Sequence, residues 1–315
     1  MNTEELNEIL ECLVGERTLF HYYPDRYAVY LLARHLRGQG DSSIRDLRSG
    51  NHAKLLNRPI LQNLIKRLGD GRLSSDDLNA LWPNDSNAYV LTLGTWGQKN
   101  QYRWAQTSRP GSNLVLQLNL SEQWAQKIQR VLDEKINEYI GMFHPLSKKR
   151  GATLAWARID LDMRSGVSLI EEIQSDLIKE LENMIIWAKY AINRDETTVE
   201  LWRRNRTTCS KTLLEVAEGL LDEIKTIWHE AMLTAAIWFL FEELGMKQVY
   251  FHSFDTGCVL KNLRRYKPPK SLYTQVPNKF CFEQTTHGPE FVMNDKHARR
   301  RLKKAKDPSW FVKAA

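Results

Sequence analysis

The spacing of apolar residues divides the chain into a helical start and a mixed remainder. Up to about residue 85, apolar residues recur at helical spacing in LNEILECLV, RYAVYLLARHL and PILQNLIKRL. The turn-rich stretches GQGDSS and GDGRLSSDD separate these segments. We therefore predict a helical N-terminal region over residues 1–85, either as a small domain or as a lid.

Further along, the pattern changes to alternation of apolar and polar residues, which is typical of strands. Residues 88–97 (AYVLTLGTWG) and 112–120 (SNLVLQLNL) predict a β-hairpin with a long connection. A helix capped by Ser121 follows, and His144-Pro145 ends it. We expect residues 86–144 to extend a larger core.

The clearest hairpin lies near the middle of the chain, where TLAWARIDLD (153–162) and VSLIEEIQSD (167–176) flank the turn 163–166. The elements expected after it are helices at about 177–192 and 211–244, a strand at 248–254 leading into Asp255-Thr256-Gly257, a helix from Cys258, and a strand within 272–285. Together these elements predict an α+β fold, with a mixed or antiparallel sheet and packed helices. The core would span 145–293, and residues 294–315 would form a basic tail.

Composition excludes some classes of protein. The 42% hydrophobic and 26% charged content is that of an ordinary globular protein. The acidic, amphipathic start predicts no secretory signal. The longest apolar run, 231–241, is shorter than the roughly 20 residues that span a bilayer. The four cysteines are scattered without a CxxC pair, so we expect reduced thiols, as in a cytoplasmic protein. We also expect that the protein does not bind membranes.

The positive charge is concentrated near the C-terminus. The chain has 45 Lys and Arg against 38 Asp and Glu, and seven of the basic residues fall within 296–306, which leaves 38 against 38 elsewhere. Such a segment commonly contacts nucleic acid phosphates, although it can equally be a solubilising, frayed terminus. The residues expected to bind nucleic acid are Arg299, Arg300, Arg301, Lys303 and Lys304.

The EEIQSD strand is the first candidate for chemistry. Because side chains alternate along a strand, Glu172 and Gln174 share a face, and Asp176 follows at the strand end. Two carboxylates and an amide could orient a substrate, serve as acid and base, or hold a divalent ion. The alternative is a solvated edge strand with Asp176 capping the next helix.

Two further polar groups follow. Trp228-His229-Glu230 opens an apolar helix, but it is not a zincin site, because position 233 is Leu where HExxH requires His. His252 and Asp255-Thr256-Gly257 end a strand, and the helical pattern after them argues against an aspartic protease. The chain has no GxSxG, no GxxxxGK[ST] loop and no GxGxxG, so ATP hydrolysis and dinucleotide redox chemistry are poorly supported.

In this order, the blocks resemble a domain of large polyvalent proteins of bacteriophages and conjugative elements. That domain has a Glu-(Ile/Val)-Gln-Ser-Asp strand, a Trp-His-Glu helix, a Thr-Gly turn and a Tyr-containing, Leu-Pro-like segment. The resemblance covers about 145–285, with Leu177 in place of an aromatic residue, and it implies a phage or mobile-element setting. The matching positions are Glu172, Gln174, Ser175, Asp176, Trp228, His229, Glu230, Thr256, Gly257, Tyr273 and Pro277.

A weaker resemblance is to the GNAT acyltransferase superfamily. The order strand, helix, strand, helix, then Tyr273 before an aromatic-bearing strand is similar to the second half of that fold. The Gln/Arg-x-x-Gly-x-Gly/Ala turn that binds the cofactor pyrophosphate is missing, so the analogy concerns the fold alone.

Three hypotheses about function follow. The first is a GNAT-like transferase or nucleic-acid-modifying enzyme. The second is a non-enzymatic nucleic-acid-binding protein that uses WRRNR (202–206), KNLRRYK (261–267) and the tail. The third is a metal-dependent hydrolase using Glu172, Asp176, His229 and His252. No cofactor, metal site or oligomeric state is assigned from the sequence.

For the enzyme hypothesis, we expect Glu172, Gln174, His229 and Thr256 to line one concavity. Glu172 and His229 would be the general bases, with Glu230 and Asp176 as further catalytic residues. The residues expected to bind substrate are Gln174, Ser175, His252, Asp255, Thr256, Gly257 and Tyr273.

Overall fold

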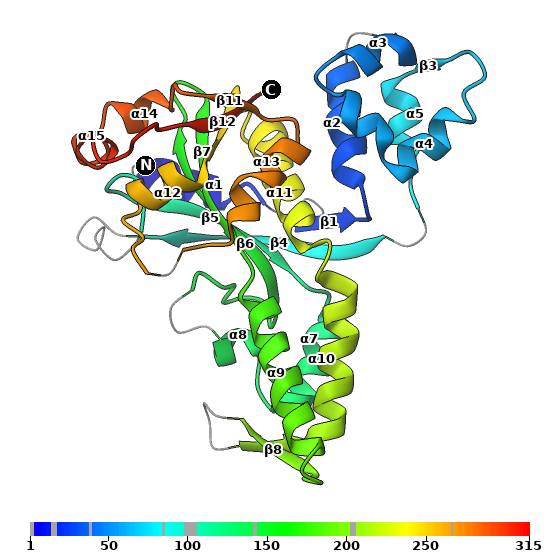
Figure 1. Cartoon of the computed structure of the whole chain (residues 1–315), viewed down its shortest axis with the longest axis vertical. Helices are drawn as coiled ribbons and strands as arrows, with labels where there is room; N and C mark the ends of the chain where they lie inside the picture. Colours follow the sequence, from blue (N-terminus) through cyan, green and yellow to red (C-terminus); the bar gives the residue numbers. More distant parts are fainter. Residues whose placement is uncertain are drawn as a thin grey trace. The chain divides into compact units, whose positions relative to one another are not determined.

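The computed structural model describes residues 3–13, 18–37, 40–83, 86–97, 106–140, 144–201, 206–265 and 267–315. Its described part contains many helices and a mixed sheet of eight strands, which confirms the predicted α+β class (Figure 1). The chain forms two compact units. Unit 1 comprises residues 1–20, 88–161 and 170–236, and unit 2 comprises 21–87, 162–169 and 237–315.

The sheet of unit 1 is built from the two predicted hairpins. Its strands β4 (Asn87–Trp96), β5 (Asn113–Asn119), β6 (Thr153–Asp162) and β7 (Val167–Gln174) are neighbours in that order. β5 pairs antiparallel with both β4 and β6. β5 is buried along its whole length and β6 along nearly all of it, because their apolar runs are covered on both faces.

The helices of unit 1 differ from the sequence prediction mainly because long predicted helices are interrupted. The helix expected after Ser121 is two helices, α7 (Glu122–Leu132) and α8 (Ile136–Ile140), because Asp133 adopts a left-handed φ of 56°. The helix expected over 211–244 is also divided. Its parts are α10 (Ser210–Ile224), α11 (Trp228–Trp238) and a π-helical turn, η3 (Phe239–Glu243), which belongs to unit 2.

The remaining elements of unit 1 are α1 (Thr3–Leu10), α9 (Asp176–Ile192) and the hairpin β8 (Thr198–Leu201) with β9 (Arg206–Cys209). α9 and α10 lie side by side along their length (Figure 1). Ser175 is the N-cap of α9, since its hydroxyl accepts a hydrogen bond from the Ile178 amide.

Unit 2 contains most of the predicted helical N-terminal region. Its helices are α2 (Arg26–Leu36), α3 (Ile44–Ser49), η2 (Ala53–Asn57), α4 (Pro59–Ile65) and α5 (Ser75–Asn79). Ser74 and Asp77 form a capping box at the start of α5. The short strands β1 (Leu19–Tyr22), β2 (Ser42–Ser43) and β3 (Arg72–Leu73) were not predicted.

The C-terminal part of unit 2 has strands in the order β10 (Gln248–His252), β12 (Trp310–Ala314) and β11 (Glu283–Thr285). β12 pairs antiparallel with both neighbours. The other elements are α12 (Phe254–Leu260), η4 (Lys270–Tyr273), α13 (Gln275–Lys279), α14 (Glu290–Met293) and α15 (Lys296–Leu302).

The interpretation of residues 294–315 as a tail is wrong. Residues 296–302 form α15, and Asp295 caps this helix by accepting hydrogen bonds from the amides of His297 and Ala298. Ala298 and Leu302 are buried in one apolar cluster with Trp310 of β12. The basic residues therefore occupy the outer side of an amphipathic helix, and its inner side holds the end of the chain in the fold.

Two other predictions need correction. Asp255-Thr256-Gly257 lie inside α12 rather than in a turn, because Ser253 caps the helix earlier than expected. Residues 270–279 are helical, so the strand predicted within 272–285 is reduced to β11. Across the described ranges, no helix combines the length and apolar character needed to cross a membrane. The four cysteines form no disulfide with one another.

Candidate functional site

The EIQSD segment and strand β6 bring four polar side chains together in unit 1. Gln174 lies at the end of β7, Asp176 begins α9, and Trp156 comes from β6. His144 joins them from the segment between α8 and β6. We call these residues, His144, Trp156, Gln174 and Asp176, the acid–histidine cluster.

The Asp176 carboxylate is the centre of this cluster. One oxygen accepts a hydrogen bond of 2.9 Å from Trp156 Nε1. The other accepts one of 2.5 Å from Gln174 Nε2 and lies 3.2 Å from His144 Nδ1. The Asp176 side chain is only 9% exposed, and that of His144 is 36% exposed. A buried carboxylate therefore holds an imidazole that solvent can still reach.

Two features of its surroundings position Asp176. The residue is the first of a 17-residue helix, whose N-terminal end carries partial positive charge. Trp156 Nε1 and Gln174 Nε2 both donate to its oxygens, so each oxygen has a hydrogen-bond partner within the protein. Asp176 is thus held in place by two donors and is suited to orient the imidazole of His144.

His144 is positioned by hydrogen bonds to the segment that follows it. Gln117 Nε2 donates to the carbonyl of Pro145 at 2.8 Å. Asn137 Nδ2 donates to the carbonyl of Ser147 at 3.0 Å, and Thr92 Oγ1 lies 3.2 Å from Ser147 Oγ. β4 and β5 therefore hold the loop that carries the imidazole.

Gly94 allows this arrangement. It lies opposite Val115 in the pairing of β4 with β5, and a Cβ atom at this position would meet Gln117 Nε2 at 3.0 Å. Any side chain here would displace the amide that holds Pro145. The sequence interpretation took His144-Pro145 only as the end of a helix, so it missed His144 as a site residue.

Glu172 is held by Arg158, its neighbour across the β6–β7 hairpin. Arg158 Nη2 lies 2.5 Å from Glu172 Oε2, and the side chains are 2% and 11% exposed. The same Nη2 donates to the carbonyl of Gln106 at 3.1 Å, and the guanidinium lies 5.7 Å from the Trp96 ring centroid. This pairing favours a positioning or structural role for Glu172 over proton transfer.

His229 and Glu230 begin α11 in unit 1. His229 Nε2 lies 4.0 Å from Glu230 Oε1, and the imidazole packs edge-on to the Trp228 ring with centroids 5.7 Å apart. Glu230 is nearly buried, whereas His229 is about a quarter exposed. The structure therefore pairs these two residues with each other, as their adjacency in the sequence suggested.

The remaining predicted site residues belong to unit 2. Thr256 Oγ1 accepts a hydrogen bond of 2.8 Å from the Ser309 amide and lies 3.0 Å from Ser253 Oγ. A Cβ atom on Gly257 would approach His252 Cβ to 3.1 Å, so these residues pack closely. Thr256 thus ties α12 to the start of β12.

Tyr273 is also an internal residue of unit 2. Its ring is buried, and its centroid lies 5.4 Å from that of Phe251 and 6.5 Å from that of Phe254. Asp255 is exposed in the first turn of α12. The expectation that Glu172, Gln174, His229 and Thr256 share one concavity stays a prediction.

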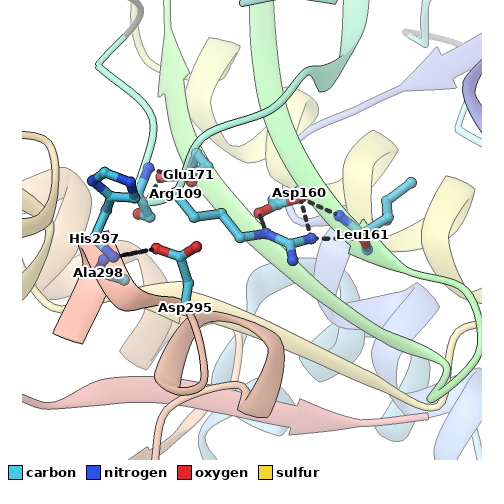
Figure 2. A network of polar contacts seen from close by, with 8 residues as sticks. Arg109, Asp160, Leu161, Glu171, Asp295, His297 and Ala298 are labelled. Carbon is cyan, nitrogen blue, oxygen red and sulfur yellow. Dashed lines mark hydrogen bonds and ion pairs between the residues drawn. The ribbon is translucent and has the colours of Figure 1, made fainter. Parts of the chain in front are cut away.

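Sequence reasoning also missed two buried carboxylates of unit 1. Figure 2 shows the Arg109 guanidinium meeting Asp160, with N–O distances of 2.6 and 3.0 Å. Burial raises the pKa of Asp160, and Arg109 opposes that increase. Ser108 donates to Glu171 through its amide at 2.9 Å and its hydroxyl at 2.7 Å. Asp160 and Glu171 thus hold the segment before β5 in place through Arg109 and Ser108. Arg109 in this turn-rich connection therefore has a structural partner.

The basic residues near the C-terminus do not all have the same role. Arg299, Arg300, Lys303 and Lys304 are exposed on or just after α15. Arg301 is partly buried and donates to the carbonyl of Leu260. In the earlier basic stretch WRRNR, residues 202–205 lie outside the described residues.

A metal site has no candidate ligand set in the ranges that the structure covers. No group of three or more His, Cys, Asp and Glu side chains there is arranged to hold a metal ion. The residues of the metal-dependent hydrolase hypothesis come from both units, Glu172, Asp176 and His229 from unit 1 and His252 from unit 2, and that hypothesis stays a prediction.

Comparisons with known proteins assign no family to the chain. No protein-family model matches it, and searches of the curated proteins and of the solved structures gave no match either. The resemblances to polyvalent-protein domains and to GNAT acyltransferases therefore rest on the motifs in the sequence.

Proposed function

We propose that the protein is an acid–base enzyme of the transferase class, with His144 as the general base and Asp176 as the residue that orients it. One observation carries this proposal: the nearly buried Asp176 carboxylate lies 3.2 Å from Nδ1 of a solvent-accessible imidazole. This pairing occurs at the EIQSD motif, where the sequence predicted a site.

The geometry suits proton transfer at the other ring nitrogen. Nδ1 of His144 lies 3.2 Å from the Asp176 carboxylate and 3.4 Å from Gln174 Nε2. In the tautomer that carries its proton on Nδ1, the ring can donate to Asp176, and Nε2 is then free to take a proton. The carboxylate also stabilises the imidazolium that then forms, as in hydrolases with an acid–histidine pair. Gln174 and Trp156 hold the carboxylate, so the imidazole is supported by a second set of hydrogen bonds.

The transferase class comes from the GNAT-like resemblance, and the phage or mobile-element setting comes from the polyvalent-protein resemblance. In such a reaction, His144 would remove a proton from an amine, hydroxyl or water nucleophile that attacks the transferred group. Ser175 is not a suitable nucleophile, because its hydroxyl donates to the Leu154 carbonyl and caps α9. A cytoplasmic location fits this proposal.

The test is acyl transfer from p-nitrophenyl acetate to water, measured by release of p-nitrophenolate. His144→Gln should lower kcat by at least about 100-fold, the usual contribution of a general base. Asp176→Asn should lower kcat far more than it raises KM, because it disturbs the imidazole and not substrate binding.

His287→Gln is the matched control, since His287 is exposed and belongs to unit 2. It should leave the rate unchanged. A parent protein no faster than its His144→Gln variant would contradict the proposal. Circular dichroism on each variant ensures that a lost rate reflects chemistry and not unfolding.

A second candidate function, nucleic-acid binding, is favoured by the exposed cations of unit 2. α12 and α15 contact each other, and basic residues follow or line both helices. Phosphate contacts by such a surface would release counterions and give salt-dependent binding. The exposed residues in this group are Arg264, Arg265, Lys267, Arg299, Arg300, Lys303 and Lys304.

A further inference from the structure

Unit 2 contains a polar cavity of about 510 Å³ that is separate from the residues discussed so far. Its walls come from α2, the segment before η2, and strands β10, β11 and β12. Its volume lies within the range of small-molecule sites. The side chains that give it its chemistry are Arg34, His35, Arg37, His52, Glu283 and Lys313.

Arg34 of α2 and Arg37, which directly follows this helix, share one carboxylate. Arg34 Nη1 lies 2.5 Å from one Glu242 oxygen, and Arg37 Nη1 lies 2.8 Å from the other. The Tyr30 hydroxyl also donates to this carboxylate at 3.0 Å. One negative charge is thus set against two positive charges, so this wall of the cavity retains an excess positive charge.

Lys313 is the most unusual residue of the cavity. It lies in β12, which is flanked by β10 and β11, and it is only 9% exposed. Its side chain makes no ion pair with any residue that the structure describes. Burial lowers the pKa of Lys313, and the nearby cations Lys54 and Arg34 act in the same direction. A buried ammonium without an ion-pair partner destabilises a protein, and a bound anion would offset that cost.

Glu283, the acidic residue that lines the cavity, offsets only part of this positive charge. Glu283 of β11 accepts a hydrogen bond of 2.7 Å from Asn51 Nδ2. Three positive side chains face or border the cavity, namely Arg34, Arg37 and Lys313. Two negative side chains, Glu283 and Glu242, oppose them, so the net charge around the cavity is positive. Lys54, which is exposed nearby, adds to it.

Two histidine rings that pack against each other at a tilt form an aromatic wall. The rings of His35 and His52 have centroids 4.4 Å apart and an interplanar angle of 32°. Both rings also line a neighbouring cavity of about 320 Å³ that Asp46 and Arg72 border. A pair of imidazoles in this arrangement presents an apolar face on which a planar ring can stack.

We propose that this cavity binds a small phosphate-bearing molecule with a planar ring. Lys313 and Arg37 contact its phosphate, and the His35–His52 pair stacks with its ring. Charge-assisted hydrogen bonds from Lys and Arg are the usual way in which proteins hold phosphate groups. The site belongs to unit 2 alone and does not depend on the chemistry proposed for His144.

Isothermal titration calorimetry with adenosine 5′-monophosphate as the probe tests the proposal on the full chain. The parent protein should bind it with a Kd below about 1 mM. Lys313→Met and Arg37→Gln should each weaken binding by about tenfold or more, which is the usual effect of losing one charge-assisted hydrogen bond. Arg37 is 59% exposed, so its variant serves even if Lys313→Met does not fold.

Lys66→Met is the matched control, because Lys66 is an exposed lysine of unit 2 that does not line the cavity. It should bind the probe as the parent does. Inorganic phosphate should bind more weakly than the nucleotide, since it cannot stack. A parent that binds neither probe, or an Arg37→Gln variant that binds as tightly as Lys66→Met, would overturn the proposal. Equal affinity for both probes would overturn the role of the histidines.

Discussion

At the scale of single residues, Glu172 and Asp176 show how the surroundings of a carboxylate set its role. Both come from the same motif, and both are nearly buried. Glu172 meets the guanidinium of Arg158, whereas Asp176 meets an indole, an amide and an imidazole. Only Asp176 is therefore linked to an imidazole, the side chain that most often serves as a general acid or base.

The Arg158–Glu172 pair gives a prediction about stability. Glu172→Gln removes the charge opposite a buried guanidinium but keeps an oxygen that can accept a hydrogen bond. We expect the free energy of unfolding to fall by about 2 to 3 kcal/mol, somewhat less than the loss on removing one partner of a buried ion pair outright. Urea denaturation of the variant and the parent measures the difference.

Glu218→Gln is the control for this measurement. Glu218 pairs with Lys189 at 2.7 Å, but both side chains are about half exposed. Its loss should therefore cost less than about 1 kcal/mol. If Glu172→Gln were as stable as the parent, or more stable, Glu172 would be a strained functional carboxylate and not a structural one.

His52 gives a prediction about pH. Burial of its ring, followed by the effects of Lys313, His35 and Lys54, lowers the pKa of His52 to about 4. In the unfolded chain a histidine titrates near 6.5, so between these values the unfolded state binds a proton that the folded state does not. Folding stability should therefore fall as the pH drops from about 6.5 to about 4.

His52→Gln should reduce that fall. The difference between parent and variant should be about 1 kcal/mol over this window, after allowing for solvent screening of a half-buried group. Thermal unfolding at several pH values between 4 and 7 measures it. The exposed His287→Gln variant should follow the parent, and parallel curves for all three proteins would refute the prediction.

At the scale of elements, the sequence was sufficient wherever the periodicity was long and the ends carried local signals. The strands of the 153–174 hairpin were predicted almost to the residue, because both alternate and a short turn joins them. α2 and α9 were predicted as well, since each shows a continuous helical pattern. Such elements depend mainly on contacts between neighbouring residues.

Elements that depend on distant partners were not predictable in this way. β12 is a strand because it pairs with β10 and β11, and the basic helix before it resembles a solvated tail. The same holds for the candidate site. The EIQSD motif identified Gln174 and Asp176, but the position of His144 depends on contacts between distant residues, such as the hydrogen bond from Gln117 to Pro145 across 28 positions of the chain. No local pattern reports such a contact.

At the scale of the whole molecule, the net charge of +7 is distributed unevenly. The excess lies in the stretch that forms α15 and its C-terminal end, where six of the seven Lys and Arg residues of 296–306 are exposed. Because Ala298 and Leu302 of this helix are buried, deleting residues 296–306 would damage the fold together with the charge. The nucleic-acid hypothesis therefore has to be tested by substitutions that remove the charge and keep the helix.

A variant in which four of these exposed cations are glutamine should bind duplex DNA more weakly and with a flatter dependence on salt. For every phosphate that the variant no longer neutralises, the slope of log K against log salt should become shallower by about 0.9. Fluorescence anisotropy titrations at several salt concentrations give this slope. The substituted residues are Arg299, Arg300, Lys303 and Lys304.

The control removes the same charge from exposed positions of unit 1, at Arg130, Lys148, Lys149 and Lys211. Both variants have the same net charge, so a general electrostatic attraction would lower binding and slope equally in the two. A local contact surface would reduce the slope only in the α15 variant. Equal slopes would therefore show that the exposed side of α15 does not bind phosphates and would leave solubility as the role of these residues.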